Sequence, residues 1–374
     1  MKKFDSRLTD VQATKVIPVR PDEFDFDEYS EYADKLNVRC KTFWTADSGV
    51  MVYRRMRVGE CFSYGCRNMK QSLEYQLGAL KMSLNFKADI PNFLEPWYGT
   101  GTIASAFGGE YVWIAGNAPA MKPAFDSIDD LLEYTPKEVK HTGIGRHTLD
   151  MIDYFMEKTG GKLPVSLTDS QSPLNIAGYL LPLDKFFTYM IMVPEKVIRL
   201  LEIIANLSVD FNNEQVKRIG NALVLPGHGF ASSTKWSGLG MSDDNAIMIS
   251  PEQYLEIVNP SAGKICRFFG GYGFHSCGDW SGWIDSVLNI KDIRMADGAF
   301  SNETDPDAIK NLEVYHRFSG TGIVLNARIV GDIHTIEQQV RRLWAPGMKL
   351  VVVTYCATCD EQNRAYDLIH RICS

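Results

Sequence analysis

The 374-residue sequence lacks several features that would assign it to a specialised class. No apolar run reaches 18 residues, so we expect no transmembrane helix. The chain does not open on a charged and then apolar leader, so we expect a cytoplasmic protein. Basic residues are not in excess, because the formal net charge is −7. We therefore expect neither a nucleic acid nor an anionic membrane as a partner.

A nucleotide-binding glycine motif is also missing. No Gly-x-Gly-x-x-Gly follows an early predicted strand, which argues against a Rossmann site and makes a doubly wound sheet the second choice. No internal repeat or low-complexity tract occurs either. With 45% hydrophobic and 23% charged residues, the composition is that of a globular protein with a large core.

What the sequence does contain is an alternation of predicted strands and helices. About eight strands over roughly 300 residues are typical of an α/β fold of the (β/α)8 TIM-barrel type. We place the barrel at residues 69–374 and interpret residues 1–68, with short strands at 42–56, as an N-terminal extension packed on it. Strands are predicted at 90–94, 111–114, 163–169, 222–225, 265–272, 293–297, 322–326 and 350–356. Helices are predicted from 69, at 126–134 and 144–158, from 194, at 335–344, and from a cap at Asp360.

Cysteine and histidine meet at two of these strand ends. His275 and Cys277 are two residues apart, a spacing that puts both side chains on one side of a strand, and Cys356 ends the strand at 350–356. Two sulfurs and one imidazole suit Zn²⁺, and three protein ligands leave a fourth position open, as in catalytic sites. A thiol on such a metal loses its proton and becomes a nucleophile for alkyl transfer. Metal-bound hydroxide and hydrolysis are the other option, and two unrelated buried cysteines are the structural alternative.

Polar residues follow other predicted strands. In barrels of this type the carboxyl ends of the strands form the active face, so we take these residues as candidates for the site. The candidates for catalysis are Glu95, Asp169, Asp243 and Asp297, and those for substrate binding are Gln171, Asp244 and Asn326. Arg54, Arg55 and Arg57 are interpreted as a charged edge strand, with an anion site as the less favoured alternative.

The residues around the His-x-Cys pair resemble a known family. Segments 273–279 and 354–365, with shorter matches at 99–101, 104–109 and 248–252, are similar to the uroporphyrinogen decarboxylase superfamily, and most of all to its zinc-dependent methyltransferases that work with corrinoid proteins. The resemblance implies a (β/α)8 barrel with His275, Cys277 and Cys356 as zinc ligands. It also implies methyl transfer between a corrinoid (cobalamin) on a partner protein and a small molecule, either a thiol such as coenzyme M or a folate, docked against Asp169, Asp243 and Asp297.

Three departures from the family pattern keep alternatives open. The chain has no Arg-Gln-Ala-Gly-Arg segment, which holds the carboxylates in true decarboxylases, and it has Glu95 where they place an aspartate. Cys359 stands where the methyltransferases usually have proline, which raises the question of a fourth ligand. The alternatives are a decarboxylase-like lyase acting on a tetrapyrrole or related acid, and a non-catalytic partner of a corrinoid protein.

Overall fold

The computed structural model describes residues 12–305 and 307–374, and its centre is a parallel sheet. Six regular strands follow one another in the order β1-β8-β7-β6-β5-β4. They are β1 (Gly49–Arg54), β4 (Leu239–Ser242), β5 (Tyr272–His275), β6 (Ile293–Ala299), β7 (Val324–Ile329) and β8 (Lys349–Thr354). Every pair among them is parallel, so their carboxyl ends lie at one end of the sheet.

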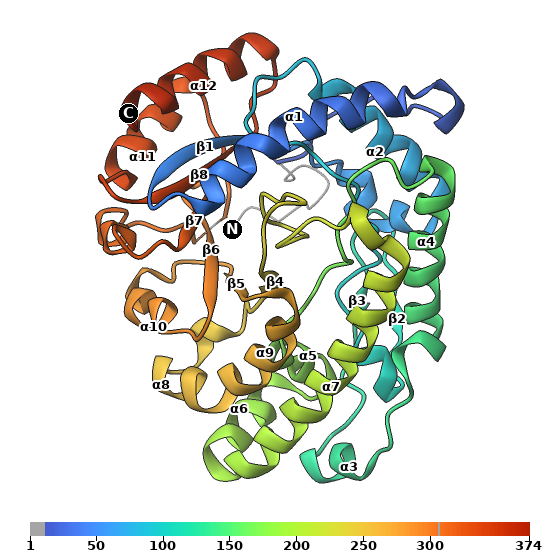
Figure 1. Cartoon of the computed structure of the whole chain (residues 1–374). Helices are drawn as coiled ribbons and strands as arrows, with labels where there is room; N and C mark the ends of the chain where they lie inside the picture. Colours follow the sequence, from blue (N-terminus) through green and yellow to red (C-terminus); the bar gives the residue numbers. More distant parts are fainter. Residues whose placement is uncertain (1–11, 306) are drawn as a thin grey trace.

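Extended segments close this sheet into a ring. The Asp89 amide donates to the Val52 carbonyl of β1 at 2.9 Å. Isolated parallel bridges then join Leu94 to Val165 and Gln171 to Ser242 of β4. The closed ring, with helices around it, is visible in Figure 1 and confirms the predicted barrel.

The predicted strands at 90–94, 163–169 and 222–225 are present only as these irregular segments. Pro91, Pro164 and Pro226 lie in or beside them. Proline has no amide hydrogen to donate to a ladder, so regular pairing stops near each of them. Residue Leu223 of the third segment forms a single bridge, to Val165.

Helices follow the strands around the outside of the ring, in sequence order from blue to red (Figure 1). Side chains cap several of them, for example Asn68 at α2, Thr142 at α4 and Ser172 at α5, and each accepts a hydrogen bond from a backbone amide of the first turn. The helices are α1 (Phe26–Thr45), α2 (Met69–Ser83), α3 (Ile128–Glu133), α4 (Gly143–Thr159), α5 (Pro173–Leu180), α6 (Leu183–Met192), α7 (Pro194–Ile219), α8 (Pro251–Gln253), α9 (Asn259–Cys266), α10 (Ile284–Leu288), α11 (Ile333–Leu343) and α12 (Cys359–Ile372). In the described part of the chain no helix is both long and apolar enough to cross a lipid bilayer.

Several sequence-based elements need correction. The stretch 265–272 was predicted as a strand, but it ends α9 and reaches β5 only at Tyr272. Gly270 and Gly271, with φ of 78° and 144°, stop the helix and turn the chain. The predicted strand at 111–114 is a short hairpin outside the barrel, formed by β2 (Tyr111–Val112) and β3 (Ala120–Met121). The cap of α12 is Thr358, not Asp360.

The beginning of the chain also differs from expectation. Residues 42–45 end helix α1 and are not a strand. Strand β1 pairs with β8 along its whole length, so the sheet begins inside the segment that was expected to be an extension. Residues 1–11 of that segment lie outside the described residues.

Side chains of β1, β7 and β8 alternate between two apolar clusters. On β8, Val351 and Val353 pack in the cluster that also contains Met51 and Tyr53 of β1. Leu350 and Val352 belong to the larger cluster shared with the helices. Since successive residues point to opposite faces, the first set faces the inside of the barrel and the second the helix layer. The alternation therefore decides which polar residues at the strand ends point into the mouth of the barrel and which point toward the helices.

Candidate functional site

A cavity of about 190 Å³ lies at the carboxyl ends of the strands. Strands β4 to β7 contribute to its wall, together with the segment after β1 and the loop before β4. The lining residues are Gln12, Arg55, Arg57, His228, Gly229, Phe230, Ser242, His275, Asp297 and Arg328. This is the end of the barrel at which enzymes of this fold have their active sites.

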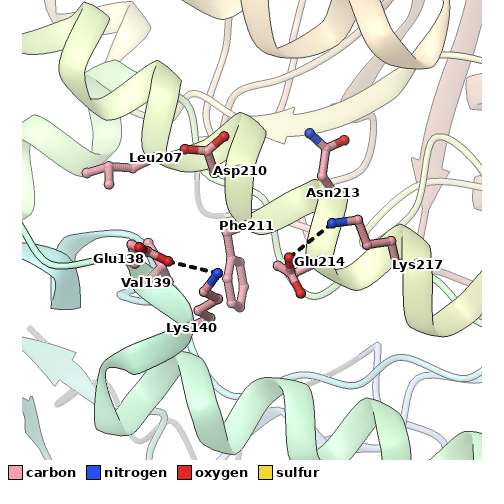
Figure 2. A pocket seen from close by; sticks show the side chains of 9 residues that line it. All are labelled: Glu138, Val139, Lys140, Leu207, Asp210, Phe211, Asn213, Glu214 and Lys217. Atoms are coloured by element: carbon pink, nitrogen blue, oxygen red, sulfur yellow. Dashed lines mark hydrogen bonds and ion pairs between the residues drawn. The ribbon is translucent and has the colours of Figure 1, made fainter.

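A second hollow, of about 310 Å³, lies between the 139–141 turn and α7 (Figure 2). Its charged groups pair with one another at the surface, as Lys140 does with Glu138 at 2.8 Å and Lys217 with Glu214 at 3.2 Å. It shares no lining residue with the cavity at the strand ends, so its larger size does not make it the better candidate.

Beside the 190 Å³ cavity, the structure brings together three groups that can bind a metal. The ligand atoms of Asp244, His275 and Cys277 all lie within 4.8 Å of one another, and among the described residues no other such group of three occurs. His275 Nε2 is 3.6 Å from Cys277 Sγ and 3.5 Å from Asp244 Oδ1. The Cys277 amide donates to the same Asp244 oxygen at 2.9 Å, which fixes the carboxylate beside the thiol.

These separations can be compared with those of a zinc site. Zinc binds sulfur at about 2.3 Å and nitrogen or oxygen at about 2.0–2.2 Å in tetrahedral geometry, which places ligand sulfur and nitrogen roughly 3.6 Å apart and nitrogen and oxygen roughly 3.4 Å apart. The observed 3.6 and 3.5 Å fall on these values. The donor set of one sulfur, one nitrogen and one oxygen therefore fits zinc, with room for a further ligand.

Asp297 holds the His275 ring from behind. Its Oδ2 is 2.6 Å from His275 Nδ1, while Arg328 Nε donates to the same oxygen at 3.0 Å and Asn326 Nδ2 donates to Oδ1 at 2.5 Å. Burial raises the pKa of Asp297, but Arg328, His275 and Asn326 outweigh it and leave this pKa below its usual value. Burial likewise lowers the pKa of His275, yet the bonds to Asp297 and Cys277 bring it well above the ordinary value. A carboxylate on Nδ1 directs Nε2 toward the metal-binding group.

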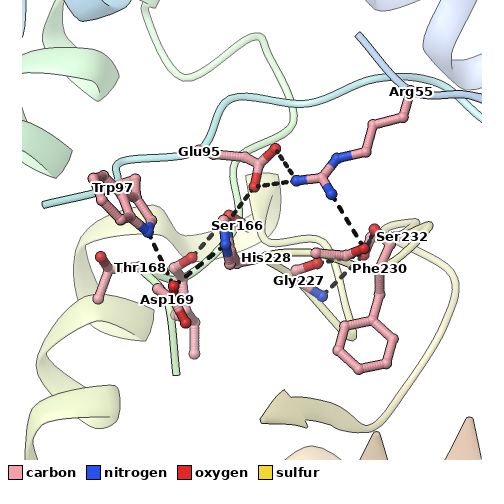
Figure 3. Close-up of polar contacts among 12 residues, drawn as sticks. Arg55, Glu95, Trp97, Ser166, Thr168, Asp169, Gly227, His228, Phe230 and Ser232 are labelled. Carbon is pink, nitrogen blue, oxygen red and sulfur yellow. Dashed lines mark hydrogen bonds and ion pairs between the residues drawn. The ribbon is translucent and has the colours of Figure 1, made fainter. Parts of the chain in front are cut away.

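A second histidine, His228, also lines the cavity, and Figure 3 shows it among Glu95, Trp97, Asp169 and Arg55. Its Nδ1 is 2.6 Å from Glu95 Oε2 and its Nε2 is 3.3 Å from Asp169 Oδ2. Arg55 pairs with Glu95 at 3.4 Å, and Trp97 Nε1 donates to Asp169 at 3.0 Å. Burial raises the pKa of Glu95, but Arg55 and His228 outweigh it and lower this pKa to about 2. We call these five residues the His228 centre.

Amide side chains connect the two histidine centres. Gln171 Nε2 donates to Asp169 Oδ1 at 2.7 Å, and Asn175 Nδ2 donates to Gln171 Oε1 at 2.9 Å. The same Asn175 nitrogen is 3.4 Å from Asp244 Oδ2. The predicted substrate residues Gln171 and Asp244 are therefore parts of one hydrogen-bonded chain around the mouth.

Asp243 was predicted to line the substrate pocket, and the structure places it elsewhere. It is completely buried on the helix side, where Ser172 Oγ donates to Oδ1 at 2.5 Å and the hydroxyls of Tyr254 and Tyr272 donate to Oδ2 at 2.6 and 3.1 Å. Burial raises the pKa of Asp243 to about 6. Because Met241 faces the helix layer, the alternation of side chains sends Asp243 there as well.

Cys356 also lies outside the metal-binding group. It continues the phase of Leu350 and Val352 and packs in the outer cluster, whereas Tyr355 takes the inward position. Its carbonyl accepts a hydrogen bond from Arg54 Nε at 2.8 Å, and burial raises the pKa of its thiol to about 11. The ligand set predicted from the sequence thus includes Cys356, whereas the structure places Asp244 beside His275 and Cys277.

Sequence reasoning missed the residues that surround the predicted ones. His228 lies in a loop rich in glycine and serine that carries no periodic pattern, and Trp97 carries none either. Arg55 was interpreted as part of a charged edge strand, but it is buried against Glu95. Arg328 offered the one usable sign, because an arginine inside the apolar stretch 324–330 has to find a charged partner.

The fold and the site together define an α/β barrel whose active-site end is polar and contains a group of side chains that can bind a metal ion. A family model described as uroporphyrinogen decarboxylase (URO-D) matches residues 43–351, so the chain belongs to the uroporphyrinogen decarboxylase family. Among 21 matching chains of solved structures is a methyltransferase from Methanosarcina mazei, with a TM-score of 0.65 and 14% identity over 90% of this chain and 98% of that one. At this identity the likeness concerns the fold. No curated protein sequence matches the chain.

Proposed function

We propose that the chain is a methyltransferase that moves a methyl group between a corrinoid (cobalamin) on a partner protein and a thiol or folate, with Zn²⁺ held by Asp244, His275 and Cys277. The observation that carries the proposal is this set of sulfur, nitrogen and oxygen ligands within 4.8 Å at the mouth of the barrel. Membership of the family and the likeness to a methyltransferase support it.

Each residue of the site has a part in this proposal. A zinc ion bound there would favour the thiolate form of a thiol substrate. The Cys277 thiolate and the Asp244 carboxylate would balance its charge, and Asp297 would keep the ring of His275 in position. His228 and Asp169 are already bonded to each other, so polar groups of the small molecule would meet the other polar residues of the cavity wall, such as Ser242.

Surface features support the partner and the compartment. Met248 and Ile247 are 65% and 37% exposed, and Ile247 lies against Gly278, next to Cys277. An apolar rim beside the site suits the docking of a partner protein. All eight cysteines are free, which is in keeping with a reducing compartment such as the cytoplasm.

The alternative reaction is decarboxylation of a tetrapyrrole or related acid, as the family's name suggests. It would leave the metal-binding group without a role. The cavity of about 190 Å³ also lies below the roughly 300–1,000 Å³ of drug-sized ligand pockets, and thus favours a smaller molecule.

Two measurements on one preparation test the proposal. Protein purified without chelator and with reduced thiols should contain about one zinc per chain, and it should demethylate methylcobalamin in the presence of a thiol, seen by the absorbance of the corrinoid. His275→Gln should lose both properties, whereas His334→Gln, at an exposed histidine of α11, should keep them. Metal far below one equivalent, together with no turnover for any thiol or folate, would exclude the proposal.

A further inference from the structure

Two consecutive aspartates follow β4 and face opposite ways. Asp244 belongs to the metal-binding group, whereas Asp243 is fully buried toward the helices. A 2.9 Å hydrogen bond from the Ala246 amide to the Asp243 carbonyl closes a turn over residues 243–246, and Asp244 is the second residue of this turn. Any contact that fixes Asp243 therefore also fixes the turn that carries Asp244.

The carboxylate of Asp243 accepts hydroxyl groups from three separate segments. Ser172, the N-cap of α5, donates to Oδ1 at 2.5 Å. Tyr254 and Tyr272 donate to Oδ2 at 2.6 and 3.1 Å, and their hydroxyl oxygens are 3.0 Å apart. On the main chain, the Asp243 amide donates to the His275 carbonyl at 2.7 Å. Asp243 is thus bonded to α5, to β5 and to the helical segment that follows α8.

Tyr254 reaches Asp243 from an unusual turn. It is the first residue of a π-helical segment, Tyr254–Val258, which lies between α8 and α9. Such π-turns are rare, and many of them occur at functional sites. The Tyr254 ring meets Phe274 and Trp283 edge to face, at centroid distances of 6.1 and 5.7 Å. The hydroxyl is therefore presented to Asp243 by a ring that is itself packed on two sides.

Stability of the fold does not account for this buried carboxylate. Removing a carboxylate from water is costly, and apolar residues of similar size are often at least as stabilising. Asp244, in contrast, needs support. Its side chain is 40% exposed, and beyond the 2.9 Å bond from the Cys277 amide its neighbours Asn175 and His275 are 3.4 and 3.5 Å away. A metal site tolerates errors of only about 0.2 Å in its ligand distances, so the backbone has to place this carboxylate.

We propose that Asp243 is a positioning residue, whose hydroxyl-bonded carboxylate fixes the 243–246 turn so that Asp244 is held beside His275 and Cys277. The assignment of zinc and methyl transfer to this group rests on the proposed function, whereas the positioning of Asp244 does not. Loss of the Asp243 carboxylate should therefore release Asp244 from the Cys277 amide whether or not a metal is bound.

The Cys277 amide reports the position of Asp244 in metal-free protein. The chain has eight cysteines, so cysteine labelled with nitrogen-15 gives few amide signals, and Cys277→Ser identifies the one required. Hydrogen exchange of this amide is measured by NMR after a chelator has removed metal, and Asp244→Ala gives the rate of the released amide. We expect Asp243→Ala to exchange about tenfold faster than the wild type, as for a lost hydrogen bond to a charged group.

A second buried carboxylate provides the matched control. Asp89 is 4% exposed and accepts a hydroxyl from Tyr366 at 2.6 Å, but its bonds join α12 to β1. Asp89→Ala should destabilise the fold in urea unfolding and leave the exchange of the Cys277 amide unchanged. Wild-type exchange in Asp243→Ala would overturn the proposal, and so would equal acceleration by Asp89→Ala.

A milder variant keeps the test decisive if Asp243→Ala does not fold. Tyr254→Phe removes one oxygen and leaves the carboxylate in place. It should accelerate exchange of the Cys277 amide about threefold, because one of the hydroxyl bonds to Asp243 is lost. Unchanged exchange in this variant would then overturn the proposal.

Metal affinity separates this inference from the proposed function. Zinc affinity is measured by competition with a chelator, and Asp243→Ala should bind zinc about 10–100-fold more weakly than the wild type, as for other changes outside the ligand shell. Asp89→Ala should bind zinc as the wild type does. Unchanged zinc affinity in Asp243→Ala would overturn the positioning role. A wild-type chain that binds no zinc, with the exchange of Cys277 accelerated as described, would exclude the proposed function and support the positioning of Asp244.

Discussion

The mouth of the barrel contains two histidines that look alike at close range. His275 lies between Asp297 and Asp244, and His228 lies between Glu95 and Asp169. In each case the shorter contact is 2.6 Å, and each histidine side chain is 15% exposed. Local histidine geometry therefore does not distinguish a metal ligand from a structural residue.

The surrounding groups do distinguish them. Next to His275 there is a thiol, Cys277, and the neighbouring carboxylate of Asp244 is 40% exposed, so a cation can approach. Around His228 there is no sulfur within the group, and both carboxylates are occupied by donors from Arg55 and Trp97. The first set has ligand capacity to spare, whereas the second is already satisfied, and this contrast yields the following predictions.

The largest expected effect is the difference in zinc content and turnover between two variants, His275→Gln and His228→Gln. His275→Gln would remove a ligand of the proposed zinc ion, so zinc affinity and methyl transfer should fall by more than the 10–100-fold that changes outside the ligand shell cost. His228→Gln should keep about one zinc per chain. Both are measured by metal analysis and by turnover of the same preparations. Equal metal loss in the two variants would mean that the two centres do not differ as described.

The His228 centre should instead control stability at low pH. The folded-state pKa of Glu95 is about 2, below its usual value of 4.5, so the unfolded chain takes up this proton first. The stabilisation, about 3 kcal/mol, is present above pH 4.5 and is lost as the pH falls toward 2. Urea unfolding between pH 6 and 3 should show this slope.

The matched variant is Glu95→Gln, which cannot titrate. It should be less stable than the wild type at pH 6, by about 3–5 kcal/mol, because Arg55 is left buried without its carboxylate. The difference should shrink as the pH falls, and its zinc content should stay unchanged. A constant difference from pH 6 to 3 would show that Glu95 does not carry the effect.

A smaller effect on zinc affinity is expected for Asp297, because its carboxylate bonds to the His275 ring and would not touch the metal. Asp297→Asn keeps an oxygen beside His275 Nδ1 but removes the charge, so zinc affinity should drop about 10–100-fold without loss of the fold. Competition with a chelator measures the affinity. Asp169→Asn is the counterpart at the His228 centre and should leave the zinc affinity within about threefold of the wild-type value, since its carboxylate does not reach the metal-binding group.

These contrasts also show what the sequence can reveal. The barrel follows from the strand and helix alternation, and the His275–Cys277 pair follows from a spacing of two, because both depend on neighbouring residues only. Asp244 was predicted as a polar strand-end residue, but its place beside Cys277 depends on the register of β4 and β5, which pairs Ser242 with His275. His228 lies in an irregular loop, where no periodicity links it to Glu95 or Asp169.

The sequence does not decide whether the side chain of Cys356 points into the barrel or toward the helix layer. The stretch from Leu350 to Val353 is apolar at every position and buried on both faces of the sheet, so it carries no alternation that identifies the inner face. A shift of one residue decides whether Tyr355 or Cys356 enters the mouth. The structure gives the inward position to Tyr355.

The smallest effect is therefore expected for the two cysteines that follow β8. Cys356→Ser should retain zinc, because its sulfur is not among the three clustered ligands, and should lose about 1–2 kcal/mol of stability from placing a hydroxyl in the outer apolar cluster. Cys359→Ser, at the first residue of α12, should change neither. Cys277→Ser is the matched cysteine variant inside the group and should lose the metal. If Cys356→Ser loses zinc as Cys277→Ser does, the last strand ends with Cys356 turned into the barrel, and Asp244 is not the third ligand.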